Sequence, residues 1–145
     1  MSSYRVRSLN TGAAALVRSF VVLGIATAAL LLLVGLARAD SMIDSYQAYL
    51  SSVDHFNSSG ARLTSAAQVL QQDRANFHRF GNGDYDDQYD SYFTSVSRRQ
   101  MMSNMVDRGG MGSAARSAIV NNNVLVWVEI WQGGSGPYVL VSILP

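Results

Sequence analysis

The residues best suited to bind a metal ion are the aspartates of an acidic cluster, residues 84–90. Counted from Asn82, oxygen-bearing side chains occupy alternate positions, as in the opening of an EF-hand calcium loop. The sixth position, however, holds aspartate instead of the required glycine, and the twelfth holds phenylalanine instead of a bidentate glutamate. We therefore favour a helix that begins with solvated acids and keep a metal site as the weaker alternative. Its candidate ligands are Asp84, Asp86 and Asp90.

Two histidines offer acid–base or metal chemistry. If two predicted helices pack side by side, His55 and His78 could meet close to Asp54 and Asp73. No ligand spacing links the histidines, and Asp73 and His78 are five residues apart, which places them on different sides of a helix. We interpret both histidines as partly exposed surface residues. A small metal-dependent or hydrolytic enzyme is therefore the least favoured hypothesis.

Both tryptophans lie on one side of a predicted strand. Two-residue periodicity in the run 124–132 separates a purely aliphatic face from a face that carries Leu125, Trp127, Glu129 and Trp131. The two indoles, about 13 Å apart, could stack on sugar rings or hold an extended peptide. Because so small a domain has few other large side chains, the indoles are expected first as part of the core. Trp127, Glu129 and Trp131 are nevertheless the best candidates for a contact surface.

Composition excludes several classes of chemistry. The chain has no cysteine, which excludes disulfides, thiol catalysis and cysteine-bound zinc, and no lysine, which excludes Schiff-base catalysis. Serines are common, but none lies in a G-x-S-x-G nucleophile elbow. From Asp40 onward seven arginines face ten acidic residues, a net charge of −3, so no nucleic-acid surface is expected. No cofactor is predicted.

The N-terminal segment has the features of an export signal. Three arginines precede an apolar run, residues 19–36, and the small-x-small sequence Ala37-Arg38-Ala39 follows that run. This order predicts cleavage between Ala39 and Asp40. A cleaved signal peptide and a retained membrane anchor would both place the remaining chain outside the cytoplasm, because arginines concentrate before the run. A buried helix of a soluble protein is the least favoured interpretation, because the run has no polar face.

The length of the apolar run leaves two interpretations of residues 1–39. A signal-peptide core normally has 7 to 15 residues and a spanning helix about 20, and this run of 18 lies between them. We favour a cleaved signal peptide. The alternative is a single-pass membrane anchor through residues 19–37. In both cases residues 40–145 form the exported domain.

Periodicity and turn residues predict an α+β fold for the exported domain. About three to four helices are expected to pack on a C-terminal antiparallel β-hairpin, whose turn is the sequence GGSGP. Thr64 or Ser65 is the expected cap of the second helix, and Gly81 its end. In chain order, we expect helices at residues 40–53, 64–81, 86–106 and 113–120, and strands at 124–132 and 138–144.

These observations favour a non-enzymatic protein of the bacterial cell envelope. In the first hypothesis, residues 40–145 are a periplasmic or secreted binding or structural module for an envelope protein or glycan. In the second, the same domain stays in the inner membrane as an anchored accessory subunit of an envelope complex. Processing at Ala39 separates the two hypotheses.

Overall fold

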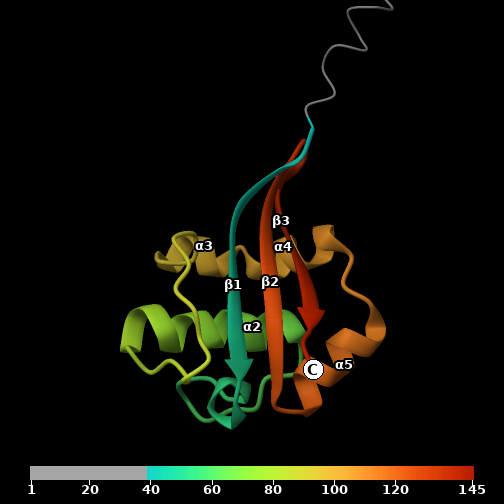
Figure 1. Ribbon diagram of the computed structural model, residues 1–145. Coiled ribbons are helices and arrows are strands. Elements are labelled where there is room, and N and C mark those ends of the chain that lie inside the picture. The colour runs from blue at the N-terminus through green and yellow to red at the C-terminus, as the bar shows by residue number, and fades with distance from the viewer. Residues whose placement is uncertain (1–38) are drawn as a thin grey trace, which may run out of the picture. The chain divides into compact units, whose positions relative to one another are not determined.

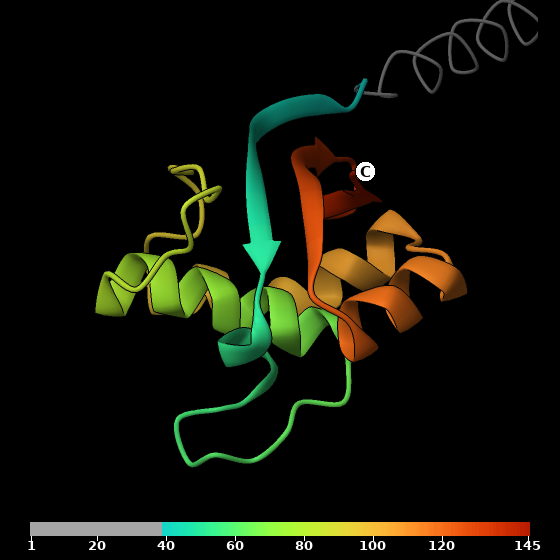
Figure 2. The same cartoon turned by 60° about the horizontal axis from the view of Figure 1, so that its bottom comes forward.

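A computed structural model describes residues 39–145. Its centre is an antiparallel sheet of three strands in the order β1-β2-β3, with bounds Ser41–Leu50, Val124–Gly133 and Gly136–Ile143. Helices of the long segment between β1 and β2 lie on one side of the strands, as Figures 1 and 2 show. The chain is therefore an α+β protein with a C-terminal hairpin, as its sequence predicts.

The first predicted helix is wrong, because residues 41–50 form strand β1. Its buried side chains are Tyr46, Ala48 and Leu50, and the residues between them are only half-buried. This two-residue alternation is a strand pattern, which the three-and-four spacing of nearby apolar residues obscured. β1 pairs with β2 along its length and adds a third strand to the predicted hairpin.

The second predicted helix is confirmed. Helix α2, Ala66–Ala75, begins after Ser65, whose hydroxyl accepts a hydrogen bond from the Gln68 amide while the Gln68 side chain accepts one from the Ser65 amide. The helix continues as a short π-helical segment, η2, Asn76–Phe80. Gly81 then ends it in the left-handed conformation, as predicted, with φ of +68°.

The third predicted helix begins about ten residues later than the sequence indicates. Residues 81–95 form no helix, and helix α3, Val96–Gln100, follows them with Ser95 as its cap. The segment 81–95, which we call the acidic loop, lies along the free edge of β1. There the Gln88 amide donates to the Gln47 carbonyl, and the Asp87 carboxylate accepts from the Tyr49 amide. These bonds replace those that a helix would supply.

The remaining helices complete the layer on one side of the sheet. They are the 3-10 turn η1, Ser52–His55, and helices α4, Met102–Gly109, and α5, Ser113–Asn121. The short helix predicted at 113–120 is thus confirmed. Between the helices and the sheet lies one hydrophobic core, to which β1, β2, α2 and α4 contribute most of the side chains. The residues of this core extend from Tyr46 to Val139 and lie within the unit 39–145, which we expect to fold on its own.

The predicted leader falls almost entirely outside the described residues. Residues 1–38, including Ala37 and the apolar run, are not described, whereas Ala39 and Asp40 lie immediately before β1. Within residues 39–145, every helix is too short or too polar to cross a lipid bilayer.

Candidate functional site

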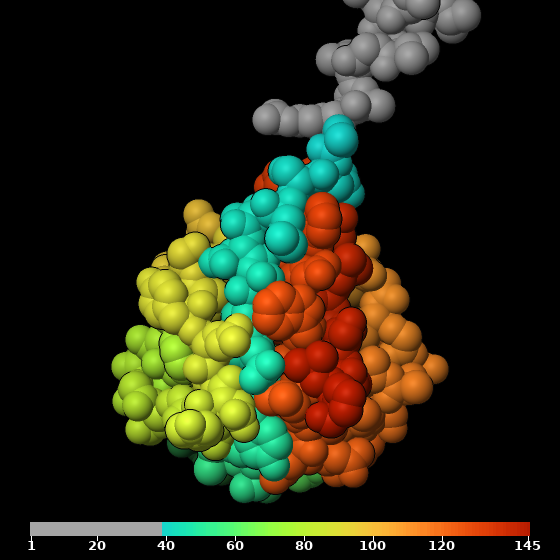
Figure 3. All heavy atoms as spheres, viewed as in Figure 1, coloured from blue at the N-terminus to red at the C-terminus, as the bar shows by residue number. Residues whose placement is uncertain are grey.

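The predicted contact residues lie on the outer face of the sheet, which we define as the face turned away from the helices. Val126, Val128 and Ile130 of β2 point into the core and are buried. Trp127 and Trp131 point the opposite way and are half-buried, as is Glu129 between them. The expectation that the indoles belong to the core is therefore wrong. No described helix covers the outer face in Figure 3.

Trp127, Glu129 and Trp131 form one hydrogen-bonded cluster, the Trp–Glu–Trp cluster. The Trp131 indole donates to one carboxylate oxygen of Glu129 at 3.0 Å, and the Trp127 indole donates to the other at 3.4 Å. Both donors come from the same strand face, two residues to either side of the acid. A carboxylate has about four acceptor sites, so two indole donors hold Glu129 in place and leave it able to bind a further donor.

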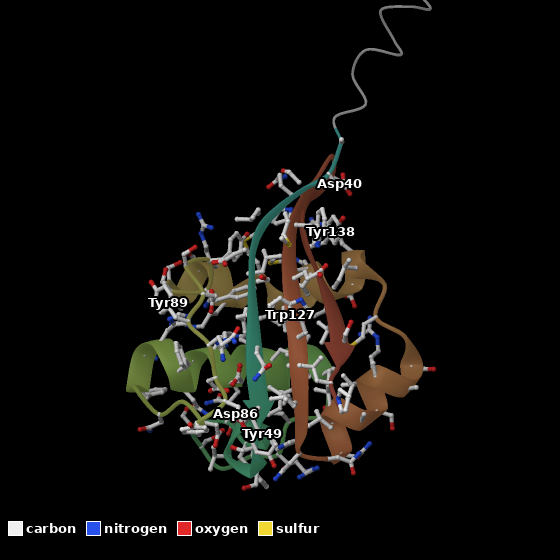
Figure 4. The ribbon with its side chains drawn as sticks, in the orientation of Figure 1. Asp40, Tyr49, Asp86, Tyr89, Trp127 and Tyr138 are labelled. Carbon is white, nitrogen blue, oxygen red and sulfur yellow. The ribbon has the colours of Figure 1, made fainter. Side chains whose placement is uncertain are left out.

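The cluster extends across the sheet to the neighbouring strands. Trp131 pairs with Met42 of β1 and with Tyr138 of β3. Its ring stacks on the Tyr138 ring with the planes 11° apart. The Tyr138 hydroxyl donates to Asp40 at 2.9 Å, and this bond raises the pKa of Tyr138 because it favours the protonated phenol. Figure 4 shows Asp40, Tyr138 and Trp127 along this side of the sheet.

The outer face and its border along β1 are acidic, whereas Arg108 of α4 lies at the other border, beside Pro137 of β3. Glu129 points to the outer face, whereas Asp44, which pairs with the buried Ile130, lies on the opposite face of the sheet. The three strands contain no arginine, and the acidic loop beside β1 contains four aspartates and no arginine. Asp86 and Tyr89 of this loop are exposed; Asp86 lies beside β1, and Tyr89 lies farther from that strand (Figure 4). A surface that combines acidic side chains and aromatic rings, with no basic side chain on its strands, can bind a cationic group.

The predicted metal candidates of the acidic loop do not converge. Asp86 is exposed, whereas Asp90 is fully buried and contacts Arg74 at 3.3 Å and His78 at 2.7 Å. Asp84 donates its backbone amide to the Asp87 carboxylate. Across residues 39–145 no group of three His, Cys, Asp or Glu side chains is placed to hold a metal ion. The acids also begin no helix, so the predicted capping role is wrong.

The two histidines have separate structural partners. His55 is buried, and its ring nitrogens lie 2.8 Å from the Ser51 carbonyl oxygen and 2.9 Å from that of Ile119. His55 therefore connects η1 to α5. His78 instead pairs with Asp90 and packs edge-to-face against Tyr89. The expectation of two surface histidines is wrong for His55, and the side chain of His78 is also largely buried.

A buried arginine, which the sequence analysis missed, fixes the acidic loop to α2. Arg74 is fully buried and contacts three carboxylates: Asp73 at 2.7 Å, Asp90 at 3.3 Å and Asp87 at 3.8 Å. Its guanidinium also lies 4.2 Å from the centre of the Tyr46 ring. No spacing rule marks this arginine, because two of its three carboxylates lie 13 and 16 residues away.

This network contains more negative than positive charge. Burial raises the pKa of Asp73 to about 7, against the opposing effect of Arg74. Burial opposes the charge of Arg74 as well, but Tyr46, Asp73 and Asp90 together raise its pKa. A partly protonated Asp73 brings the group closer to neutrality. The network therefore positions the border of the outer face and offers no open site of its own.

Comparison of the chain with protein-family models, curated proteins and solved structures finds no match. The outer face and its chemistry are therefore the basis for assigning a function.

Proposed function

We propose that the chain is an exported binding protein of the bacterial cell envelope, and that its outer sheet face binds a basic segment of another protein. The observation that carries the proposal is the Trp–Glu–Trp cluster, which lies on an uncovered sheet face without any arginine. Tryptophan rings attract cations through their faces, and Glu129 supplies a matching carboxylate. A protein partner accounts for the surrounding acids, which a neutral glycan would not need.

The exposed acids extend the same match beyond the cluster. Asp86 is exposed beside β1, and Asp40 is exposed next to the Tyr138 hydroxyl. Asp44 lies on the opposite face of β1, where bonds from the backbone and the hydroxyl of Ser91 lower its pKa despite partial burial. Exposed acids around an aromatic centre increase the rate at which a basic partner associates. We expect this binding to weaken as salt concentration rises.

A titration with a short oligoarginine peptide tests the proposed face. The chain has only two tryptophans, so the indole N–H signals of Trp127 and Trp131 report directly on the cluster by NMR. We expect both signals to shift on titration. Glu129→Gln should weaken binding about tenfold or more, because a hydrogen bond to a charged group contributes about 1.5 kcal/mol or more.

Asp107→Asn is the matched control, because Asp107 is an exposed carboxylate on α4 that pairs only with Arg116. It should leave peptide affinity within about twofold, as expected for a distant surface charge. Equal losses in the two variants would contradict a specific role for the cluster. Binding of a neutral oligosaccharide that shifts the same indoles, with no response to oligoarginine, would favour a glycan partner instead.

The export part of the proposal rests on the order of arginines, apolar run and Ala37-Arg38-Ala39. Expression of the full chain in a bacterium should give a soluble periplasmic species whose intact mass begins at Asp40. Replacing Ala39 with Trp should block this processing, whereas Arg38→Gln, at the unrestricted middle position, should not. A full-length membrane species would support the anchored accessory subunit, and a soluble full-length species would exclude both.

A further inference from the structure

A second surface feature lies among the helices, away from the outer face of the sheet. It is a half-open cleft of about 330 Å³ between α2 with η2 on one side and α3 on the other. This volume is at the lower end of the range for small-molecule sites. Figure 1 labels α2 and α3. The polar residues that line the cleft are Asn57, Gln68, Gln71, Gln72, Arg79, Arg99 and Gln100.

Two positive charges face this cleft with no acid among its lining residues. Arg99 is buried, and one of its terminal nitrogens donates to the carbonyls of Phe93 at 2.7 Å and Thr94 at 2.9 Å. Its pKa is lowered, first because burial disfavours the charged guanidinium and then because Arg79 repels it. Two arginines that line one cleft without an acid favour the binding of an anion.

The remaining lining supplies hydrogen bonds and a small apolar surface. Gln68 and Gln72 already bond to Ser65 and Asn76. The side-chain amides of Gln71 and Gln100 offer both donors and acceptors, which is the combination that hydroxyl groups require. Leu63, Ala75 and Val96 provide apolar contact on the same cleft. An inorganic anion would use the two arginines and leave these amides unused. A ligand with both an acid group and hydroxyls would use the arginines and these amides together.

We propose that this cleft binds a small hydroxylated oxyanion, of the class of sugar acids and sugar phosphates. Arg79 and Arg99 hold the acid group, and Gln71 and Gln100 bind the hydroxyls. The site is independent of the Trp–Glu–Trp cluster, whose charge selects the opposite sign of ligand.

Isothermal titration of residues 39–145 with glucuronate, glucose 6-phosphate, glucose and inorganic phosphate tests this proposal. We expect at least one of the two sugar anions to saturate the cleft below about 10 mM, with glucose and inorganic phosphate at least about tenfold weaker. NMR shifts on binding should centre on Arg79, Arg99 and Gln100. Saturation by neither sugar anion, or equal affinity for inorganic phosphate, would overturn the proposed ligand class.

Arg79→Gln provides the decisive variant, because Arg79 is exposed and its loss leaves the bonds of Arg99 to the backbone intact. It should weaken binding of the sugar anion about tenfold or more. Arg98→Gln is its matched control: Arg98 also lies over an aromatic ring, as Arg79 does, but does not line the cleft. Equal weakening by the two variants would show only general charge attraction and would overturn the site.

Discussion

Replacing Arg74 with methionine should lower the free energy of unfolding by about 3–5 kcal/mol, the usual cost of removing one partner from a buried ion network. Methionine keeps much of the side-chain volume, so the decrease in the free energy of unfolding comes mainly from removal of the positive charge and less from a cavity. The variant leaves Asp73, Asp87 and Asp90 close together without a cation, in surroundings that water does not reach. Urea unfolding at pH 8, followed by tryptophan fluorescence and circular dichroism, measures the change.

The same variant should recover stability as the pH falls. A carboxyl whose pKa is raised by folding holds its proton more tightly in the folded state, so it stabilises the fold below that pKa and loses this effect as the pH rises through it. Asp73 already has a pKa of about 7, and removal of Arg74 raises it further. The loss at pH 5 should therefore be smaller than at pH 8.

Arg98→Met is the control for this prediction, because Arg98 is exposed and lies over the Tyr92 ring at the surface. It should cost about 1 kcal/mol or less at either pH. A loss for Arg74→Met no greater than that of the control would mean that the acidic loop does not depend on the buried arginine. A larger loss at pH 5 than at pH 8 would contradict the excess of negative charge in the network.

The elements that the sequence predicts well are those whose signals are local. The turn sequence GGSGP fixes the hairpin through its own glycines, and Ser65 with Gln68 fixes the start of α2 through a capping box only three residues long. Gly81 ends the same helix because it adopts a positive φ. Each of these signals acts within a few residues, so no knowledge of the distant chain is needed.

The elements that the sequence misses depend on partners far along the chain. β1 is a strand because it pairs with β2, whose residues lie about eighty positions away, and its apolar residues fit a helix nearly as well. The acidic loop avoids helix because Asp87 and Gln88 bond to the edge of β1 instead. A backbone amide or carbonyl that bonds to a distant strand is no longer free to bond within a helix, so this pairing overrides the local helix propensity.

The candidate sites divide in the same way. The Trp–Glu–Trp cluster was predictable, because alternation along one strand is enough to place its three side chains on one face. The cleft between α2 and α3 was not, since Arg79 and Arg99 meet only after the intervening loop folds against β1. The buried position of Arg74 likewise depends on carboxylates that three-dimensional folding brings to it.

Gly109 is where α4 packs directly against the edge of the sheet, and Gly109→Ala should lower the free energy of unfolding by about 2 kcal/mol. A β-carbon at this position would overlap the carbonyl oxygen of Val139 on β3. Because both sides of the contact are backbone, neither can turn away, and the helix must shift. Alanine favours helix over glycine by about 1 kcal/mol, so a contact without this overlap would give a gain in stability instead.

The sign of the measured change therefore decides whether α4 is held against β3. Arg108, the preceding residue, donates to the Pro137 carbonyl at 3.1 Å, and a shift of the helix would break this bond as well. Gly134→Ala in the hairpin turn is the control, since a β-carbon there meets no atom within 4 Å and its φ is not positive. It should change stability by less than about 0.5 kcal/mol.

Because β3 is an edge strand, displacement of α4 should also expose the backbone of Val139. Increased amide hydrogen exchange of Val139 and Val141 in Gly109→Ala would reveal this exposure. A variant with unchanged exchange and a higher unfolding free energy would show that the helix does not protect this edge.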